Sequence, residues 1–220
     1  MNKSYLIYFA GDLFDQKHIT GNALLGQMIE KISNGKYKCH LPQNKETIKD
    51  RGTPIRDKDI ENLMKCDCAI FNFDGTDLDS GTVVEFCYAK MVDIPSIQLR
   101  TDIRQSGDQN NGGDPWNLMC SGYPRTKSLL LNALGMWQES IAKCSNLSEQ
   151  LEYFHKSIAV KIIEQLDTVI ATKPLFNGNI DQANTTYNWA IKTVGGKLNE
   201  YLTESQVSEL IQLKYNKGLI

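Results

Sequence analysis

The feature that most constrains this chain is the alternation of short apolar runs with helix-like segments. The clearest unit starts with an apolar run at residues 68–73 and passes through a turn rich in carboxylates at 74–79. A helix-like segment at 80–91 and a second apolar run at 94–99 follow. Strands that alternate with helices of this length imply right-handed crossovers and a parallel sheet. The sequence therefore predicts an α/β fold.

Other segments extend the same pattern. Further strands are expected at residues 5–9, 37–41 and 128–131, and a helix at 24–32. Asp57 is a plausible N-cap for a helix that carries Ile60, Leu63 and Met64 on one face.

From Asn146 the pattern becomes helical. Asn146 and Glu149 have the spacing of a capping box, and a long helix with one apolar stripe is expected to end near Lys173. Two more helices are expected at 187–194 and 203–214. We therefore divide the chain into a catalytic domain at 1–145 and a helical C-terminal extension at 146–220.

Composition excludes several classes of protein. The 220 residues include 24 basic and 26 acidic side chains, with a net charge of −2, and no basic block stands out. Binding to nucleic acid or to a membrane surface is therefore not indicated. The apolar run near the N-terminus is too short for a signal peptide or a spanning helix, so a cytoplasmic location is expected.

The six cysteines show no disulfide framework, and several lie in apolar segments as reduced core thiols do. Cys66 and Cys68 with Cys39 and His40 suggest a metal site only weakly, because Cys-x-Cys lacks the usual zinc spacing. Two polar loops, at 43–54 and 102–114, are long enough to fold over a site; the second is equally compatible with a plain linker.

The acidic turn lies where parallel α/β sheets bind ligands, at the carboxyl end of a strand. Asp79 and Glu85 flank the start of a helix, whose N-terminus favours ionised carboxylates. A carboxylate in such a pocket can attack the anomeric carbon of a sugar. The alternative is that Asp77 and Asp79 are solvated turn residues and that Glu85 pairs with Lys90.

Other catalytic patterns are weaker. The sequence has no Gly-x-Ser-x-Gly elbow, and its three histidines lie apart. Gly11 follows the first strand without the further glycines of a phosphate-binding loop.

An ordered set of segments resembles the nucleoside 2-deoxyribosyltransferase family over roughly the first 135 residues. The segments are Tyr8-Phe9-Ala10-Gly11-Asp12-Leu13-Phe14, Leu41-Pro42-Gln43, Cys66-Asp67-Cys68-Ala69-Ile70, Asp74-Gly75, Asp79-Ser80-Gly81-Thr82-Val83-Val84-Glu85-Phe86-Cys87-Tyr88-Ala89, Thr101-Asp102-Ile103-Arg104 and Trp116-Asn117-Leu118-Met119. The resemblance implies a flavodoxin-like, doubly wound parallel sheet of five strands.

It also implies a retaining exchange of the base on a 2′-deoxynucleoside, with no metal or other cofactor. By position, Glu85 matches the nucleophile, Tyr8 the tyrosine that orients it, and Asp67 an aspartate near the base that could transfer a proton to the leaving group. The implied partners are 2′-deoxynucleosides and free nucleobases.

The remaining matched positions concern binding. Asp79 matches a ligand of a sugar hydroxyl, and Asn117 an asparagine that reaches into a neighbouring subunit's site, which implies a homo-oligomer. Gly11, Phe14 and Gln43 are expected to lie against the substrate.

The chain departs from the family in two places. Asp12 stands where the family usually has proline, and about a hundred residues follow the Asn117 region, where better-known members end. This tail could cover the site, build the oligomer or restrict the substrate.

Two rival functions remain open. One is hydrolysis of 2′-deoxynucleoside 5′-monophosphates by the same nucleophile, which the Asp79 carboxylate disfavours by repelling a phosphate. The other is a non-catalytic nucleoside or nucleotide sensor.

Overall fold

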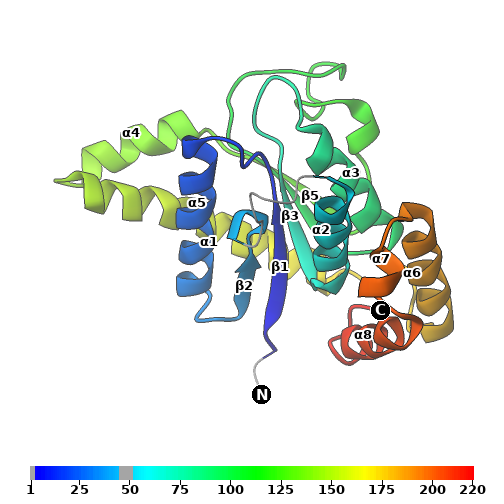
Figure 1. Ribbon diagram of the computed structural model, residues 1–220. Coiled ribbons are helices and arrows are strands. Elements are labelled where there is room, and N and C mark those ends of the chain that lie inside the picture. Colours follow the sequence, from blue (N-terminus) through cyan, green and yellow to red (C-terminus); the bar gives the residue numbers. More distant parts are fainter. Residues whose placement is uncertain (1–2, 45–51) are drawn as a thin grey trace.

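A computed structural model describes residues 3–44 and 52–220 (Figure 1). Five strands form one sheet in the order β2-β1-β3-β4-β5, and every pairing is parallel. The strands are β1 (Tyr5–Ala10), β2 (Tyr37–His40), β3 (Cys68–Asn72), β4 (Ser96–Arg100) and β5 (Thr126–Leu130). This order is that of flavodoxin-like folds, so the expected five-stranded, doubly wound sheet is confirmed.

Helices cover both faces of the sheet. They are α1 (Gln16–Ile32), α2 (Thr53–Lys65), α3 (Ser80–Met91), α4 (Ala133–Lys143), α5 (Leu147–Ala171), α6 (Ile180–Val194), α7 (Leu198–Tyr201) and α8 (Glu204–Asn216), with short 3-10 turns η1 (Pro42–Asn44) and η2 (Leu118–Cys120). None of the helices in this described part of the chain is both long and apolar enough to cross a membrane.

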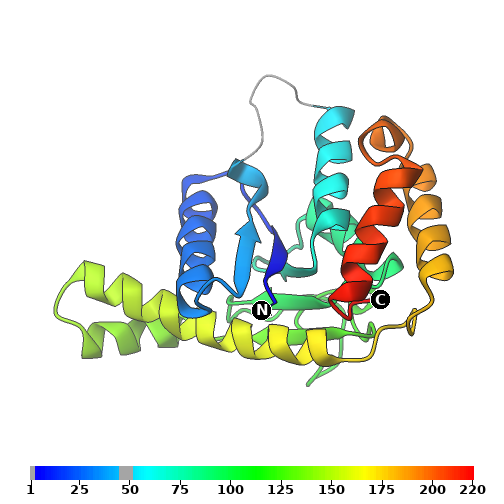
Figure 2. The same cartoon turned by 90° about the horizontal axis from the view of Figure 1, so that it is seen from below.

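One face of the sheet packs against α1 and α5. Ile29 of α1 and Ile162 and Leu166 of α5 are fully buried with Ile7 and Ile97 of the sheet. Figure 2 shows α5 running beneath the sheet, while its first turns and α4 project together as an arm. Helix α5 therefore belongs to the core of the sheet domain. The domain boundary predicted at residue 146 falls just before this helix.

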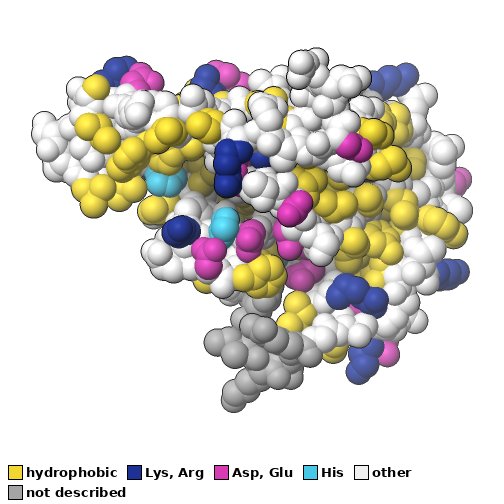
Figure 3. Space-filling view, turned by 90° about the horizontal axis from the view of Figure 1, so that it is seen from above, with side chains coloured by type: hydrophobic (Ala, Val, Ile, Leu, Met, Phe, Trp, Pro, Cys, Tyr) yellow, Lys and Arg dark blue, Asp and Glu magenta, His cyan; other side chains and the backbone are white. Residues whose placement is uncertain are grey.

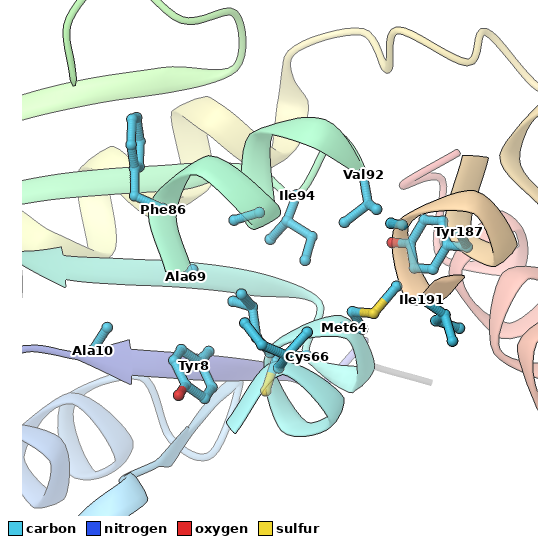
Figure 4. Packing of buried hydrophobic residues seen from close by; sticks show 14 of the residues in the cluster. Tyr8, Ala10, Met64, Cys66, Ala69, Phe86, Val92, Ile94, Tyr187 and Ile191 are labelled. Atoms are coloured by element: carbon cyan, nitrogen blue, oxygen red, sulfur yellow. The ribbon is translucent and has the colours of Figure 1, made fainter. Parts of the chain in front are cut away.

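The opposite face packs against α2 and α3, and a second layer lies outside them. Residues 175–220, which contain α6 to α8 and are called the tail below, form this layer. Figure 4 shows Tyr187 and Ile191 of α6 beside Val92 and Met64, in one hydrophobic cluster with Tyr8. The tail therefore covers helices that in turn cover the sheet.

The end of the chain returns to the amino ends of the strands. Lys217 Nζ lies 2.6 Å from Asp67 Oδ2, Lys214 donates a hydrogen bond to the Cys66 carbonyl, and Arg125 donates one to the Leu219 carbonyl. Near the same edge, Lys3 donates to the Lys217 carbonyl. The carboxyl edge of the sheet lies on the other side of the molecule, so the tail does not cover that edge.

Several expected boundaries change. Asp57 is not an N-cap: α2 begins four residues earlier, with Gly52 as N-cap, and Asp57 lies inside it. Strand β5 begins at Thr126 and ends at Leu130, α6 begins at Ile180, and α4 and α7 are not among the predicted elements. Asn146 caps α5 as predicted, although the Glu149 side chain accepts from Ser145 N rather than from Asn146 N, and Thr203 forms a capping box with Gln206 at the start of α8.

The loop predicted at 43–54 lies in part at residues 45–51, outside the described residues. The loop predicted at 102–114 is joined to the sheet, because Arg100 donates to the Arg104 carbonyl at 2.8 Å and to Ser106 Oγ at 3.3 Å.

Candidate active site

The candidate site lies at the carboxyl edge of the sheet between β1 and β3, where the strand order reverses. Parallel α/β sheets bind ligands at such a switch point. Gly11 follows β1 here, and a Cβ on it would lie 2.9 Å from the Cβ of Asn72 at the end of β3. A larger residue would push the two strand ends apart, which is a physical reason for glycine in this position.

The central contact joins β1 to α3. Tyr8, fully buried in β1, donates a hydrogen bond of 2.5 Å from its hydroxyl to Glu85 Oε1. Glu85 is partly exposed, and its neighbour Phe86 packs edge-on against Phe71 and Phe73. The aromatic contacts hold α3 against the sheet, so that the carboxylate stays beside the phenol.

Asp59 of α2 lies close enough to this phenol for its negative charge to act on it. Burial, followed by the negative charges of Glu85 and Asp59, holds the pKa of Tyr8 well above its usual range. The phenol therefore remains a hydrogen-bond donor at neutral pH. One carboxyl group is hydrogen-bonded to a neutral phenol and a second acts on it electrostatically, a combination that can supply a nucleophile and a proton donor.

Asp67 is not part of this group, and the prediction that placed it near a leaving base is wrong within this chain. It precedes β3, at the amino end of the strand, where it accepts a hydrogen bond from Leu6 N at 2.8 Å and pairs with Lys217. Topology explains the difference. A crossover helix starts at the carboxyl edge and runs back to the amino edge, so Asp59, midway along α2, lies nearer the site than Asp67, which follows the end of the helix.

Asp59 could have been found from the sequence by this rule. The residue to look for is a carboxylate within the helix that precedes β3, rather than one directly before the strand. The resemblance drew attention to Asp67 because that residue adjoins the matched strand.

Asp79 has two roles in the structure. Its Oδ2 accepts hydrogen bonds from Thr82 N at 2.7 Å and Thr82 Oγ1 at 2.8 Å, so it caps α3. It also lines a hollow of about 300 Å³, together with Asp12, His18, Asn72, Asp74, Gly75, Thr76, Asp77 and Arg104. Figure 3 looks onto this edge and shows acidic side chains gathered beside a histidine.

The hollow is acidic. Its one arginine, Arg104, is already paired with Asp102, with contacts of 3.0 Å from Nε and 2.5 Å from Nη2. Asp74 is held by Thr101 N at 2.5 Å and Asp102 N at 2.8 Å, which ties the loop after β3 to the end of β4. The hollow therefore suits neutral or positively charged groups better than an anion.

The other predicted binding residues surround this edge. Gln43 is partly buried and donates from Nε2 to the Ile19 carbonyl at 2.7 Å. Phe14 is 74% exposed. Asn117 is exposed and accepts a hydrogen bond from Met119 N, which caps η2. The structure places Gln43 and Phe14 beside the β1–α1 loop and Asn117 on the surface.

Lys90 is not the partner of Glu85. It is buried at the opposite end of α3, where it donates to the Ile94 carbonyl at 2.6 Å. In the described parts of the chain, no three side chains among His, Cys, Asp and Glu are grouped so as to hold a metal ion.

Comparison with known proteins connects this geometry to a family. A family model described as nucleoside 2-deoxyribosyltransferase matches residues 7–119, about half of the chain. That range contains most of β1, all of β2 to β4, and Tyr8, Asp59, Asp79 and Glu85. No curated protein matches the sequence significantly.

Solved structures give more distant likenesses. A conserved protein from Enterococcus faecalis V583 is 21% identical, with a TM-score of 0.47 over 75% of this chain and 98% of that one. A 2-deoxyribosyltransferase from Leishmania mexicana is 24% identical, with a TM-score of 0.44 over 54% and 86%. A 2-deoxyribosyltransferase from Bacillus psychrosaccharolyticus is 14% identical, with a TM-score of 0.40 over 45% and 74%.

Proposed function

Because the chain belongs to the nucleoside 2-deoxyribosyltransferase family, we propose that it transfers 2-deoxyribose between nucleobases with retention of configuration. The observation that carries the proposal is the 2.5 Å hydrogen bond from the Tyr8 hydroxyl to Glu85, at the switch point of the sheet and next to an acidic hollow.

The reaction would proceed in two displacements. The Glu85 carboxylate attacks C1′ of the deoxynucleoside, the C1′–N bond breaks, and the base departs with the bonding electrons and gains a proton. The product is a deoxyribosyl ester of Glu85. A second base then attacks C1′ and loses a proton, while the ester C–O bond breaks and restores the carboxylate. Two inversions give net retention.

Residues around Glu85 fit the remaining roles. Tyr8 orients the carboxylate through its hydrogen bond, and Asp59, whose charge also acts on the phenol, replaces Asp67 as the candidate proton donor to the departing base. Since 2-deoxyribose lacks an electron-withdrawing 2-hydroxyl, positive charge develops readily at C1′. One carboxylate and one proton donor can therefore suffice.

Asp79 is the proposed ligand of a sugar hydroxyl. It lines the hollow from the start of α3, six residues before Glu85 in the sequence. The carboxylates of the hollow favour a free hydroxyl over a phosphate there, which favours nucleosides over 5′-monophosphates.

A product assay tests the function. The purified protein is incubated with a 2′-deoxynucleoside, with and without a different free base, and products are separated by chromatography. A new deoxynucleoside supports transfer, and free base alone supports the hydrolase. If neither product forms with any purine or pyrimidine substrate, the transferase and the hydrolase are both refuted, and a non-catalytic nucleoside sensor is favoured.

The nucleophile is tested by Glu85→Ala, which should abolish turnover while circular dichroism and thermal melting remain those of the folded protein. The matched control, Glu209→Ala on the exposed surface of α8, should keep full activity. Near-normal rates for Glu85→Ala would refute the assignment.

We also propose a homo-oligomer whose subunits share sites. The support is exposed apolar and amide side chains next to the site, including Phe14, Asn117 and Met119, which is 70% exposed. The test is to mix Glu85→Ala with Asn117→Ala, each inactive alone. If sites are shared, mixed oligomers contain intact sites and activity returns; no recovery after subunit exchange would contradict sharing.

A further inference from the structure

Helix α2, which carries Asp59, has few restraints of its own at its amino end. Gly52 is its N-cap and supplies no side-chain hydrogen bond. Ile60, Leu63 and Met64 pack α2 against the sheet in the cluster that contains Tyr8. The first turns, before Ile60, must be held by something else.

The turn between α6 and α7 supplies the missing restraint. The backbone N–H of Lys197 donates a 2.7 Å hydrogen bond to Asp57 Oδ2, and Arg56 contacts Asp57 Oδ1 at 2.6 Å. The Asp57 side chain is only 1% exposed, although it is a carboxylate. A buried carboxylate is retained at such a place only when partners of this kind compensate its lost hydration.

Gly196 shows how close this contact is. Its φ is +61°, and a Cβ on it would lie 2.3 Å from Asp57 Oδ2. No residue with a side chain fits without moving the carboxylate or the turn. One turn further on, Lys58 Nζ lies 4.2 Å from the ring centre of Tyr201 in α7, a cation–π contact.

Asp57 and Asp59 lie on opposite sides of α2. Successive residues turn by about 100° around a helix, so residues two apart differ by about 200°. Asp57 therefore faces the tail while Asp59 faces Tyr8, and α2 lies between them as a rigid spacer. The tail contacts the side of α2 that is opposite the site.

We propose that the tail is a positioning element for the reaction: its Gly196–Lys197 turn holds Asp57, and thereby holds Asp59 beside Tyr8 and Glu85. Asp57 touches neither substrate nor Glu85; it acts through α2. This inference rests on the proposed function for its catalytic consequence, and it assigns a role to residues beyond the family match, which ends at residue 119.

The test separates proton donation from the rest of the reaction. 2′-Deoxyguanosine needs a proton on its departing base, whereas 7-methyl-2′-deoxyguanosine carries a positively charged base that leaves without one. In Asp57→Asn, kcat for base release from 2′-deoxyguanosine should fall by about 10- to 100-fold, because displacing a catalytic group by up to about 1 Å has a cost of this size. In the same variant, kcat for the methylated substrate should fall by less than about twofold.

Two further variants complete the set. Gly196→Ala, which alters no carboxylate chemically but displaces that of Asp57 or the turn, should show the same split between the substrates. Asp181→Asn, an exposed aspartate in the first turn of α6, should change neither rate. Equal losses with both substrates, or no loss with either, would overturn the proposal.

Hydrogen–deuterium exchange supplies a readout that needs no activity. Amides of α2 should exchange faster in Asp57→Asn than in the unaltered protein, while those of α3 stay unchanged. If the unaltered protein releases base from neither substrate, the proposed function fails. If α2 amides exchange at the same rate in Asp57→Asn as in the unaltered protein, the positioning role fails, whatever the activity.

Discussion

At the scale of single residues, the candidate site is built on one buried phenol that is hydrogen-bonded to Glu85 and lies within the electrostatic influence of Asp59. Tyr8 keeps its proton because burial and the neighbouring charges of Glu85 and Asp59 raise its pKa. A donor that stays protonated can orient Glu85 over the whole neutral and mildly alkaline range. Activity should therefore show no loss from Tyr8 ionisation below about pH 10, where unperturbed tyrosine titrates.

The Tyr8 hydroxyl is tested by Tyr8→Phe. The ring still fills its place, so the melting temperature should change little, while kcat should fall by about 100-fold because Glu85 loses its orienting donor. Steady-state kinetics and thermal melting measure the two effects. Tyr37→Phe is the matched control, since Tyr37 is also a buried strand tyrosine but donates to Asp167, away from the site. It should keep kcat.

The residue scale also shows where sequence patterns succeed. Tyr8 lies in the matched segment that contains β1, and Asp79 and Glu85 lie in the matched segment that begins α3, so their neighbourhood at the carboxyl edge follows from the chain order. The sequence does not separate Asp59 from Asp67 in this way, because both precede the same strand. They differ in that Asp59 lies within α2 and Asp67 follows its end.

At the scale of elements, Asp79 serves two purposes, because it caps α3 and also lines the hollow where we propose that the sugar binds. Serine is as good an N-cap as aspartate but carries no charge. Asp79→Ser should therefore keep the melting temperature, weaken deoxynucleoside binding, and reduce discrimination against 5′-monophosphates.

Asp79→Ala serves as the comparison, because alanine removes both roles. It should lower the free energy of unfolding by about 1 kcal/mol, the usual cost of losing an N-cap. Denaturant unfolding and substrate kinetics distinguish the two variants. If Asp79→Ser bound deoxynucleosides as tightly as the unaltered protein, Asp79 would not be a substrate ligand.

The far end of α3 contains Lys90, which is 8% exposed. Burial is the main cause that lowers its pKa to about 7. Between pH 7 and its ordinary pKa of 10.5, the unfolded chain binds a proton that the folded chain has released. Burial of Lys90 therefore lowers the free energy of unfolding by its full amount below pH 7, and by less as the pH rises from 7 toward 10.5.

The prediction compares the unaltered protein with Lys90→Met from pH 7 to 8.5. The free energy of unfolding of the unaltered protein should rise, relative to the variant, by about 1 kcal/mol per pH unit. Lys192→Met, on the exposed surface of α6, should show no such difference in slope. Parallel pH profiles for Lys90→Met and the unaltered protein would contradict a lowered pKa.

At the scale of the whole molecule, the tail closes the amino edge of the sheet while the site occupies the carboxyl edge. Arg125, before β5, forms a 2.6 Å ion pair with Asp93, before β4, and both side chains are almost fully buried. Arg125 also donates to the Leu219 carbonyl, and Asp93 accepts from Leu175 N. This one pair therefore binds both ends of the tail to the sheet.

Arg125→Met should lower the free energy of unfolding by about 3–5 kcal/mol, because it leaves the Asp93 carboxylate buried without its cation. The double variant Arg125→Met with Asp93→Asn should be more stable than the single variant, since it removes the orphaned charge. Denaturant unfolding measures both. A double variant less stable than Arg125→Met would show that the pair acts mainly through its backbone contacts.

The sequence by itself determined the α/β class, the five strands, most helix positions and the two segments that contain Tyr8 and the pair Asp79 and Glu85. These follow from local periodicity, capping residues and the order of segments, which are properties of neighbouring residues. The tertiary structure alone decided that Asp59 and not Asp67 lies within reach of Tyr8, and that the tail contacts α2 at Asp57. Both depend on which end of the sheet and which side of a helix a residue reaches, and packing between distant segments sets these.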